Sequence, residues 1–249
     1  MVRQQQIAAN LRAVILAGDL RVGDRVPSTS ELMTEYGVTD KTVQRALAIL
    51  KAEGFVKGEK GVGVFVTAQS QPAVIRVGWD WAVTDTGQPY PWITDHASQG
   101  RIGSSELRFV GEVPAPAEVA AAYGLDIGTP VVVRHQLLKL NGEPAELVWS
   151  YYTTDIARGT LLAETKKIQG GSPVVLAELG HALRSAIDQV MTRLATVEEF
   201  TELQLPEDMP VLRQLRVVYS DSRRPVEVTV MVKAGQKYQI QYELPEQTQ

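Results

Sequence analysis

The sequence contains no cysteine, which excludes disulfide bonds, thiolate metal ligands and a cysteine nucleophile. It also lacks any apolar run approaching the roughly 18 residues that a membrane helix needs. Residues 1–5 are polar and have no signal-peptide core. The histidines His96, His135 and His181 are far apart, and none lies in a metal-binding motif. Neither a phosphate-binding glycine loop nor a nucleophile elbow is present. We therefore expect a cytoplasmic protein that is not an enzyme, avoids membranes and carries no metal or cofactor.

Charge is divided unevenly along the 249 residues. The net charge of −4 argues at first against nucleic acid as a partner. Residues 1–67, however, hold nine Lys and Arg against seven Asp and Glu, a net of +2, whereas residues 68–249 carry a net of −6. This asymmetry indicates that the first segment suits a polyanion and the second does not.

Three helices and a hairpin are expected in residues 1–67. Apolar residues recur at helical spacing over residues 4–17, and Gly18 ends that helix. Ser28 and Glu31 have capping-box spacing at the start of a second helix, which ends at Gly37. A third helix runs from Thr39 to about residue 52 with an apolar inner face. Two strands around the turn at residues 58–61 then form a small wing. Together these elements predict a winged helix-turn-helix.

The outward face of the third helix carries the candidate chemistry. Arg45 can contact guanine and Gln44 adenine in the major groove, while lysines of the helix and wing suit phosphates. The alternative is an ordinary solvated helix face. The full set of candidate DNA-binding residues is Ser28, Thr29, Ser30, Thr39, Asp40, Lys41, Thr42, Gln44, Arg45, Lys57, Lys60 and Gly61.

This segment resembles the GntR regulators. The resembling motifs are Gly18 to Ser28, Glu31-Leu32, Tyr36-Gly37-Val38, Thr42-Val43, Ala46-Leu47 with Leu50, Glu53-Gly54 and the Gly61 to Val66 wing. The resemblance implies a dimer on a near-palindromic operator, with Gly61 near the minor groove. Three positions that are usually Arg in this family are Ser30, Asp40 and Gln44 here, and all three fall where bases are read.

Residues 68–76 are the expected linker, and residues 77–249 the expected second domain. That domain contains an internal repeat of about 80 residues, in which the segment from Pro130 to Glu146 corresponds to that from Pro210 to Glu227. Each copy is expected to be a helix, a strand, a hairpin turn and a strand. The fold class is therefore predicted as α+β on an antiparallel sheet.

Two glutamates, Glu146 and Glu227, lie in otherwise apolar strands, where a buried carboxylate needs a partner. Arg134 on the neighbouring strand is the candidate partner. These residues form either a pocket in which Arg134 holds an anion, or an internal salt bridge with glutamates that only support the sheet.

Residues 76–243 resemble the UTRA domain of the HutC branch of the GntR family, whose fold is related to chorismate lyase. The resembling motifs include Ser98-Gln99-Gly100, Leu125 to Pro130, Gly142-Glu143-Pro144 and Pro225-Val226-Glu227. In sugar-phosphate-responsive relatives, the positions of Arg134, Glu146 and Glu227 line the effector site. A second Arg and a Tyr of that site are replaced here by Gln136 and Lys233.

The resemblance implies the effector residues Trp92, Thr94, Arg134, Gln136, Glu146, Ser150, Tyr152, Glu227 and Lys233. Trp79, Trp81 and Tyr90 fall near the same pocket loop, where aromatic rings either stack on a ligand or pack in the core. We expect a homodimeric repressor that binds operator DNA and is released by a small polar or anionic effector. The alternatives are a constitutive repressor whose second domain only dimerises, and a lyase-like enzyme.

Overall fold

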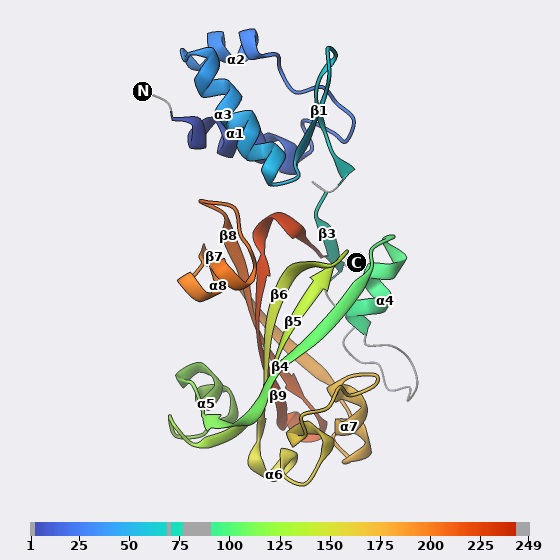
Figure 1. Cartoon of the computed structure of the whole chain (residues 1–249). Coiled ribbons are helices and arrows are strands. Elements are labelled where there is room, and N and C mark those ends of the chain that lie inside the picture. The colour runs from blue at the N-terminus through green and yellow to red at the C-terminus, as the bar shows by residue number, and fades with distance from the viewer. Residues whose placement is uncertain (1–2, 69–70, 77–90, 243–249) are drawn as a thin grey trace, which may run out of the picture. The chain divides into compact units, whose positions relative to one another are not determined.

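The computed structural model describes residues 3–68, 71–76 and 91–242. The chain divides into two compact units, with the first boundary between Ala73 and Val74. Figure 1 shows the helices of the first unit and the large sheet of the second. Trp79, Trp81 and Tyr90 lie outside the described residues.

The first unit is a three-helix winged helix-turn-helix. Its elements are α1 (Gln4–Ala17), α2 (Thr29–Tyr36), α3 (Asp40–Ala52), β1 (Val56–Glu59) and β2 (Gly63–Val66), with β1 and β2 antiparallel. The capping box at α2 is formed: Oγ of Ser28 accepts from the Glu31 amide at 3.3 Å, and Oε2 of Glu31 accepts from the Ser28 amide at 2.7 Å. Gly37 ends α2 with a φ of 62°, a left-handed conformation that glycine adopts at little cost. The turn between α2 and α3 is therefore set by local sequence.

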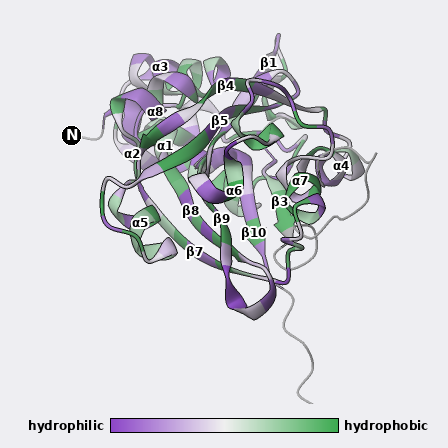
Figure 2. Cartoon of the chain, turned by 90° about the horizontal axis from the view of Figure 1, so that it is seen from below, coloured by the Kyte–Doolittle hydropathy of each residue, from purple (hydrophilic) through white to green (hydrophobic). Residues whose placement is uncertain are grey.

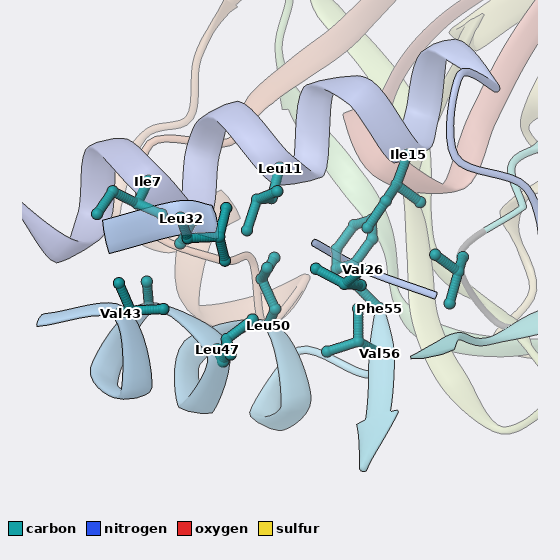
Figure 3. Close-up of a cluster of buried hydrophobic side chains, with 13 residues drawn as sticks. Ile7, Leu11, Ile15, Val26, Leu32, Val43, Leu47, Leu50, Phe55 and Val56 are labelled. Atoms are coloured by element: carbon teal, nitrogen blue, oxygen red, sulfur yellow. The ribbon is translucent and has the colours of Figure 1, made fainter. Parts of the chain in front are cut away.

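The core of this unit lies between α1, α2, α3 and the first wing strand. Figure 3 shows Leu11 and Leu50 pointing toward one another, with Phe55 closing one end. Each fully buried Leu or Ile contributes about 1.5–3 kcal/mol relative to an exposed side chain. Arg12 on α1 forms a two-pronged ion pair with Glu53, with Nη2 to Oε1 at 2.7 Å, and this pair joins α1 to the end of α3. The positions of α3 and the wing are thus fixed from inside.

The second unit is built on one six-stranded antiparallel sheet, in the order β4-β5-β6-β9-β8-β7. Its strands are β4 (Gly103–Pro114), β5 (Pro130–Leu140), β6 (Glu143–Thr153), β7 (Ser185–Leu194), β8 (Pro210–Tyr219) and β9 (Pro225–Ala234). The short strands β3 (Ala73–Arg76) and β10 (Tyr238–Gln241) form a separate pair. The helices are α4 (Pro91–Ser98), α5 (Ala117–Tyr123), α6 (Thr154–Ala157), α7 (Ser172–Glu178) and α8 (Val197–Glu202). Single 3₁₀ turns are η2 (Leu161–Ala163), η3 (Asp221–Arg223) and η4 (Gly235–Lys237).

The predicted repeat is visible in the sheet. One copy is β4-α5-β5-β6 and the other is β7-α8-β8-β9, and the two copies pair through β6 and β9 at the centre. Each copy thus begins with a strand before the predicted helix. That first strand is an edge strand in both copies, with one neighbour, so it carries a weaker apolar signal than the central strands.

The two faces of the sheet differ in their covering. One face packs against α5 through a core that includes Val119, Val133 and Val228. The opposite face packs against α6, η2 and α7 through a core that includes Val132 and Tyr152. Figure 2 shows hydrophobic and hydrophilic residues interleaved along the strands, as expected when neighbouring side chains point to opposite faces.

Candidate functional site

The exposed face of α3 is the candidate DNA-reading surface. Val43, Ala46, Leu47 and Leu50 are buried. Of the predicted residues on this helix, Asp40, Lys41, Gln44 and Arg45 are exposed, and Thr42 is half-buried. The polar face therefore lies opposite the apolar face, as the periodicity predicts.

The starts of α2 and α3 belong to one surface. Nε2 of Gln44 donates to Oγ1 of Thr29 at 3.2 Å, which links the two helices of the helix-turn-helix. Ser28 is engaged in the α2 cap, and its Oγ lies 3.1 Å from Oγ of Ser30. Thr39 precedes α3, with its Oγ1 3.1 Å from that of Thr42. The predicted polar residues of both helices are thus brought together locally.

The wing carries the remaining predicted DNA-binding residues. Lys57, Lys60 and Gly61 are exposed, and Nζ of Lys57 lies 3.3 Å from a carboxylate oxygen of Glu59. Gly61 has a φ of +76°, in the left-handed region that favours glycine. The tip of the wing therefore presents backbone without a side chain.

A small cavity lies on the sheet face covered by α7. Its volume is about 60 Å³, well below the roughly 300–1,000 Å³ of sites for drug-sized ligands. Four predicted effector residues line it: Arg134, Gln136, Ser150 and Tyr152. The other lining residues are Ser105, Leu107, Lys167, Ile168, Gly171 and Ser172.

Arg134 is the buried cation of this cavity, with 4% of its surface exposed. Its Nη1 donates to the carbonyls of Leu161, Leu162 and Glu164 at 3.2, 3.1 and 2.8 Å, and its Nη2 to that of Lys166 at 2.6 Å. Burial lowers the pKa of Arg134 from its usual value. The guanidinium nevertheless stays charged, because arginine is not deprotonated in proteins. The expected pairing of Arg134 with Glu146 is wrong, because the guanidinium binds backbone carbonyls of η2 and of the residues that follow it.

Glu227 lies directly behind the cavity wall. Its Oε2 accepts hydrogen bonds from the hydroxyls of Tyr152 at 2.8 Å and Ser172 at 2.6 Å, and its Oε1 accepts from Thr229 at 2.9 Å. Burial, and then the charge of Glu227, raise the pKa of Tyr152 well above its usual value, so the phenol stays a donor. Two of the predicted residues therefore meet here, Tyr152 in the wall and Glu227 behind it.

Glu146 forms the internal salt bridge that was the alternative reading, but with Lys233. Nζ of Lys233 lies 2.5 Å from Oε1 of Glu146, and the two side chains are 3% and 1% exposed. The residues are direct neighbours in the β6–β9 register. Neither residue lines the cavity.

Trp92 belongs to the surroundings of this ion pair. Its ring lies 4.3 Å from that of His96, which in turn lies 6.0 Å from that of Tyr238. Nζ of Lys233 is 5.4 Å from the centroid of the Tyr238 ring. Thr94 is exposed on α4. Neither Trp92 nor Thr94 lines the cavity, so the predicted effector set divides into two groups.

Sequence reasoning missed the cavity residues contributed by the segment from η2 to α7. Gly170 and Gly171 have φ values of 78° and 83°, and Pro173 stands in the first turn of α7. The glycines and proline could have predicted a loop and a helix start. They could not predict its place over Arg134, because that contact joins residues about thirty positions apart.

Comparison with known proteins decides the family. Residues 3–66 match the bacterial regulatory proteins of the gntR family, and residues 98–239 match the UTRA domain. The chain belongs to the GntR family. Its first unit thus implies DNA binding and its second a small-molecule effector.

The relatives of this GntR protein are transcriptional regulators rather than enzymes. An uncharacterised HTH-type regulator of Streptomyces coelicolor is 26% identical over 96% of this chain and 91% of its own length. One of Rhizobium meliloti is 30% identical over 90% and 87%. The histidine utilization repressor of Pseudomonas putida is 28% identical over 87% and 82%.

A solved structure shows the same fold. The crystal structure of PhnF from Mycobacterium smegmatis superposes with a TM-score of 0.61 at 21% identity, covering 96% of this chain and 99% of PhnF. Among the described residues, no helix is long and apolar enough to cross a membrane. Nor do His, Asp and Glu side chains gather there in groups of three that could hold a metal.

Proposed function

We propose that this GntR-family protein is a cytoplasmic, dimeric repressor that binds a near-palindromic operator and releases it when a small anionic effector binds the second unit. The exposed face of α3 supplies the base contacts, and the wing supplies contacts to phosphate and the minor groove. Similarity to the histidine utilization repressor supports repression as the direction of control.

The observation that carries the effector proposal is the charge of the cavity. Arg134 is buried beside it, yet within the described part of the chain no carboxylate lies within 4.0 Å of the guanidinium. Backbone carbonyls satisfy its donors but do not neutralise its charge. An anion is a stronger acceptor for a guanidinium than a neutral carbonyl. An anionic effector is therefore the ligand that this cavity suits best.

The size of the cavity suggests how binding would be coupled to a change in the protein. An effector larger than a few water molecules must displace the segment from Leu161 to Gly171, whose carbonyls now occupy Arg134. Such a ligand binds the displaced state better than the closed state, and only that difference in affinity shifts the equilibrium. In a dimer the shift would change the spacing of two winged helices on half-sites about one helical turn, or a multiple, apart.

The test is a footprint of the purified protein on DNA upstream of its own gene, at near-physiological salt and with excess non-specific DNA. A protected two-fold-symmetric site is expected. Arg45→Ala should cost roughly 1–3 kcal/mol of specific binding. Unchanged operator affinity in that variant would show that α3 does not read the operator.

A panel of small organic anions and phosphates then tests release of the footprint. Arg134→Ala should still protect the operator but should not respond to any anion that releases the wild type. The closed cavity also fits the alternative of a constitutive repressor. That alternative predicts that no anion raises the melting temperature of the protein, whereas an effector that binds only the folded state must raise it.

A further inference from the structure

A second cationic surface lies at the base of the wing and adds Arg25 and Lys51, which are not among the residues expected to contact DNA, to Lys60, which is. It is an open groove between the end of α3 and the hairpin of β1 and β2. Three cations line it: Arg25 before α2, Lys51 near the end of α3, and Lys60 in the turn of the wing. The rest of the lining is Gly58, Glu59, Gly61, Val62, Gly63 and Val64.

The backbone fixes Arg25 beside the wing. Arg25 forms an antiparallel bridge with Phe65, and the amide of Val26 donates to the carbonyl of Val64 at 2.8 Å. The segment before α2 thus runs alongside β2, joined to it by an isolated bridge. The start of the Arg25 side chain is therefore held as firmly as the wing itself.

Two glycines of the wing make room for the cations. A methyl group at Gly63 would lie 2.8 Å from Nε of Arg25, and one at Gly58 would lie 3.2 Å from Nζ of Lys51. Both side chains therefore rest against bare backbone. A side chain at Gly63 would therefore force the Arg25 side chain to shift.

None of the three cations forms an ion pair within the described residues, although the charge of Arg25 contributes to lowering the pKa of Glu31. In the described residues, no carboxylate lies within 4.0 Å of the charged groups of Arg25, Lys51 or Lys60. Glu59, the acidic residue of the groove, pairs with Lys57 at 3.3 Å. All three cations are exposed, so a polyanion can reach them.

The place of Lys51 along α3 determines which part of DNA it can reach. Lys51 follows Lys41 by ten residues, about 15 Å along the helix axis. When the start of α3 contacts base edges, Lys51 lies at the far end of the helix, away from those bases, where the sugar-phosphate backbone is the nearest part of DNA. The groove contains three cations, glycine backbone and Glu59, whose carboxylate pairs with Lys57. Cations beside bare backbone suit a phosphate.

We propose that Arg25 and Lys51 bind DNA backbone phosphates at the base of the wing, which extends the DNA contact beyond the face of α3 and the wing tip. The inference rests on the proposed operator binding. It assigns these two residues to positioning and affinity, and leaves the choice of sequence to α3.

The experiment measures operator affinity of the full-length protein against salt, from 50 to 200 mM KCl, for wild type, Arg25→Gln, Lys51→Gln and the double variant. Arg21→Gln is the matched control, because Arg21 is exposed on the turn after α1 and does not line the groove. Each lost phosphate contact reduces the slope of log affinity against log salt by about 0.9. Because the bound dimer carries each residue twice, the double variant removes four contacts and should lose about 3.6 units of slope. It should weaken on operator and random DNA alike, while the control keeps the wild-type slope.

The outcomes separate this inference from the proposed function. Absence of specific binding by the wild type would refute operator binding itself. If the wild type binds and the double variant has the same salt slope, the phosphate contacts are overturned. They are also overturned if the double variant loses affinity for operator DNA alone, because that result indicates base reading. Arg25→Lys keeps the charge and should keep the slope, which distinguishes lost contact from lost folding. The groove would be assigned to a free anion instead if the double variant keeps the wild-type slope and inorganic phosphate raises the melting temperature of the wild type but not that of the double variant.

Discussion

At the scale of single residues, four charged side chains that were all predicted to bind the effector have different roles in the structure. Arg134 and Glu227 lie at the cavity, the first bonded to backbone carbonyls and the second to three hydroxyls. Glu146 and Lys233 neutralise one another elsewhere on the same sheet. A carboxylate in an apolar strand demands a partner, but the identity of that partner depends on which strands pair.

The Glu146–Lys233 pair leads to a stability prediction. Lys233→Met should destabilise the protein by about 3–5 kcal/mol, because it leaves a buried carboxylate without its counter-charge. The double variant Glu146→Leu, Lys233→Met should recover most of that loss, since apolar residues often replace a buried ion pair at little cost. Urea unfolding of the two single variants and the double variant measures this. A double variant no more stable than Lys233→Met would contradict the pairing.

Two histidines, His96 buried and His135 half-buried, predict a dependence of stability on pH. Burial lowers the pKa of both His96 and His135 from the usual 6.5. The folded state holds both rings neutral, so the unfolded state binds more protons as the pH falls, and stability drops from about pH 6.5 downward. Each histidine contributes at most about 1.4 kcal/mol per pH unit. Urea unfolding between pH 7.5 and 5.5 should show this decline. His96→Gln should make it shallower, and an unaltered decline would show that His96 does not contribute.

At the scale of elements, local signals were sufficient for the first unit. The Ser28–Glu31 capping box and the glycine at position 37 set α2 and the turn that follows. The inner face of α3 appears directly in the spacing of Val43 and Leu47. Elements held by neighbours a few residues away are predictable because their stabilising contacts lie within one segment of sequence.

The second unit was predictable only where it repeats itself. The repeat revealed the hairpins that begin near Pro130 and Pro210, but the edge strands β4 and β7 have one neighbour each and show no strong pattern. Only part of the cavity lining was predicted from the sequence. Residues of β5 and β6 were expected there, whereas the wall formed by Lys167 to Ser172 depends on a contact to Arg134 across the fold.

The segment from Leu161 to Gly171 predicts a change in protease sensitivity. Lys166 and Lys167 are exposed, but Arg134 donates a hydrogen bond to the carbonyl of Lys166. Arg134→Ala removes four hydrogen bonds to this segment, so trypsin should cut after Lys166 or Lys167 faster than in the wild type. Fragment masses over time measure the rate. Arg158→Ala, which removes an exposed arginine paired with Glu112, is the control and should leave this cleavage unchanged. Equal rates in all three proteins would show that Arg134 does not restrain the segment.

At the scale of the whole molecule, each of the two units has a hydrophobic core of its own. The first unit buries its own cluster around Leu11 and Leu50, and the second buries clusters on both faces of its sheet. Each unit can therefore unfold as a cooperative transition of its own. Regulation then has to appear as an energetic coupling between ligands that bind different units.

Calorimetry tests that coupling. Operator DNA should stabilise the first unit and an anionic effector the second, each by about 2.7 kcal/mol at a hundredfold excess over Kd. Each ligand should therefore raise the melting temperature of the unit that it binds. If the effector releases DNA, the two ligands together must stabilise less than the sum of their separate effects, because coupling between binding sites is reciprocal. Arg134→Ala should keep the DNA effect and lose both the effector shift and the shortfall. A fully additive result in the wild type would mean that the second unit binds its ligand without controlling DNA binding, and would contradict release by the effector.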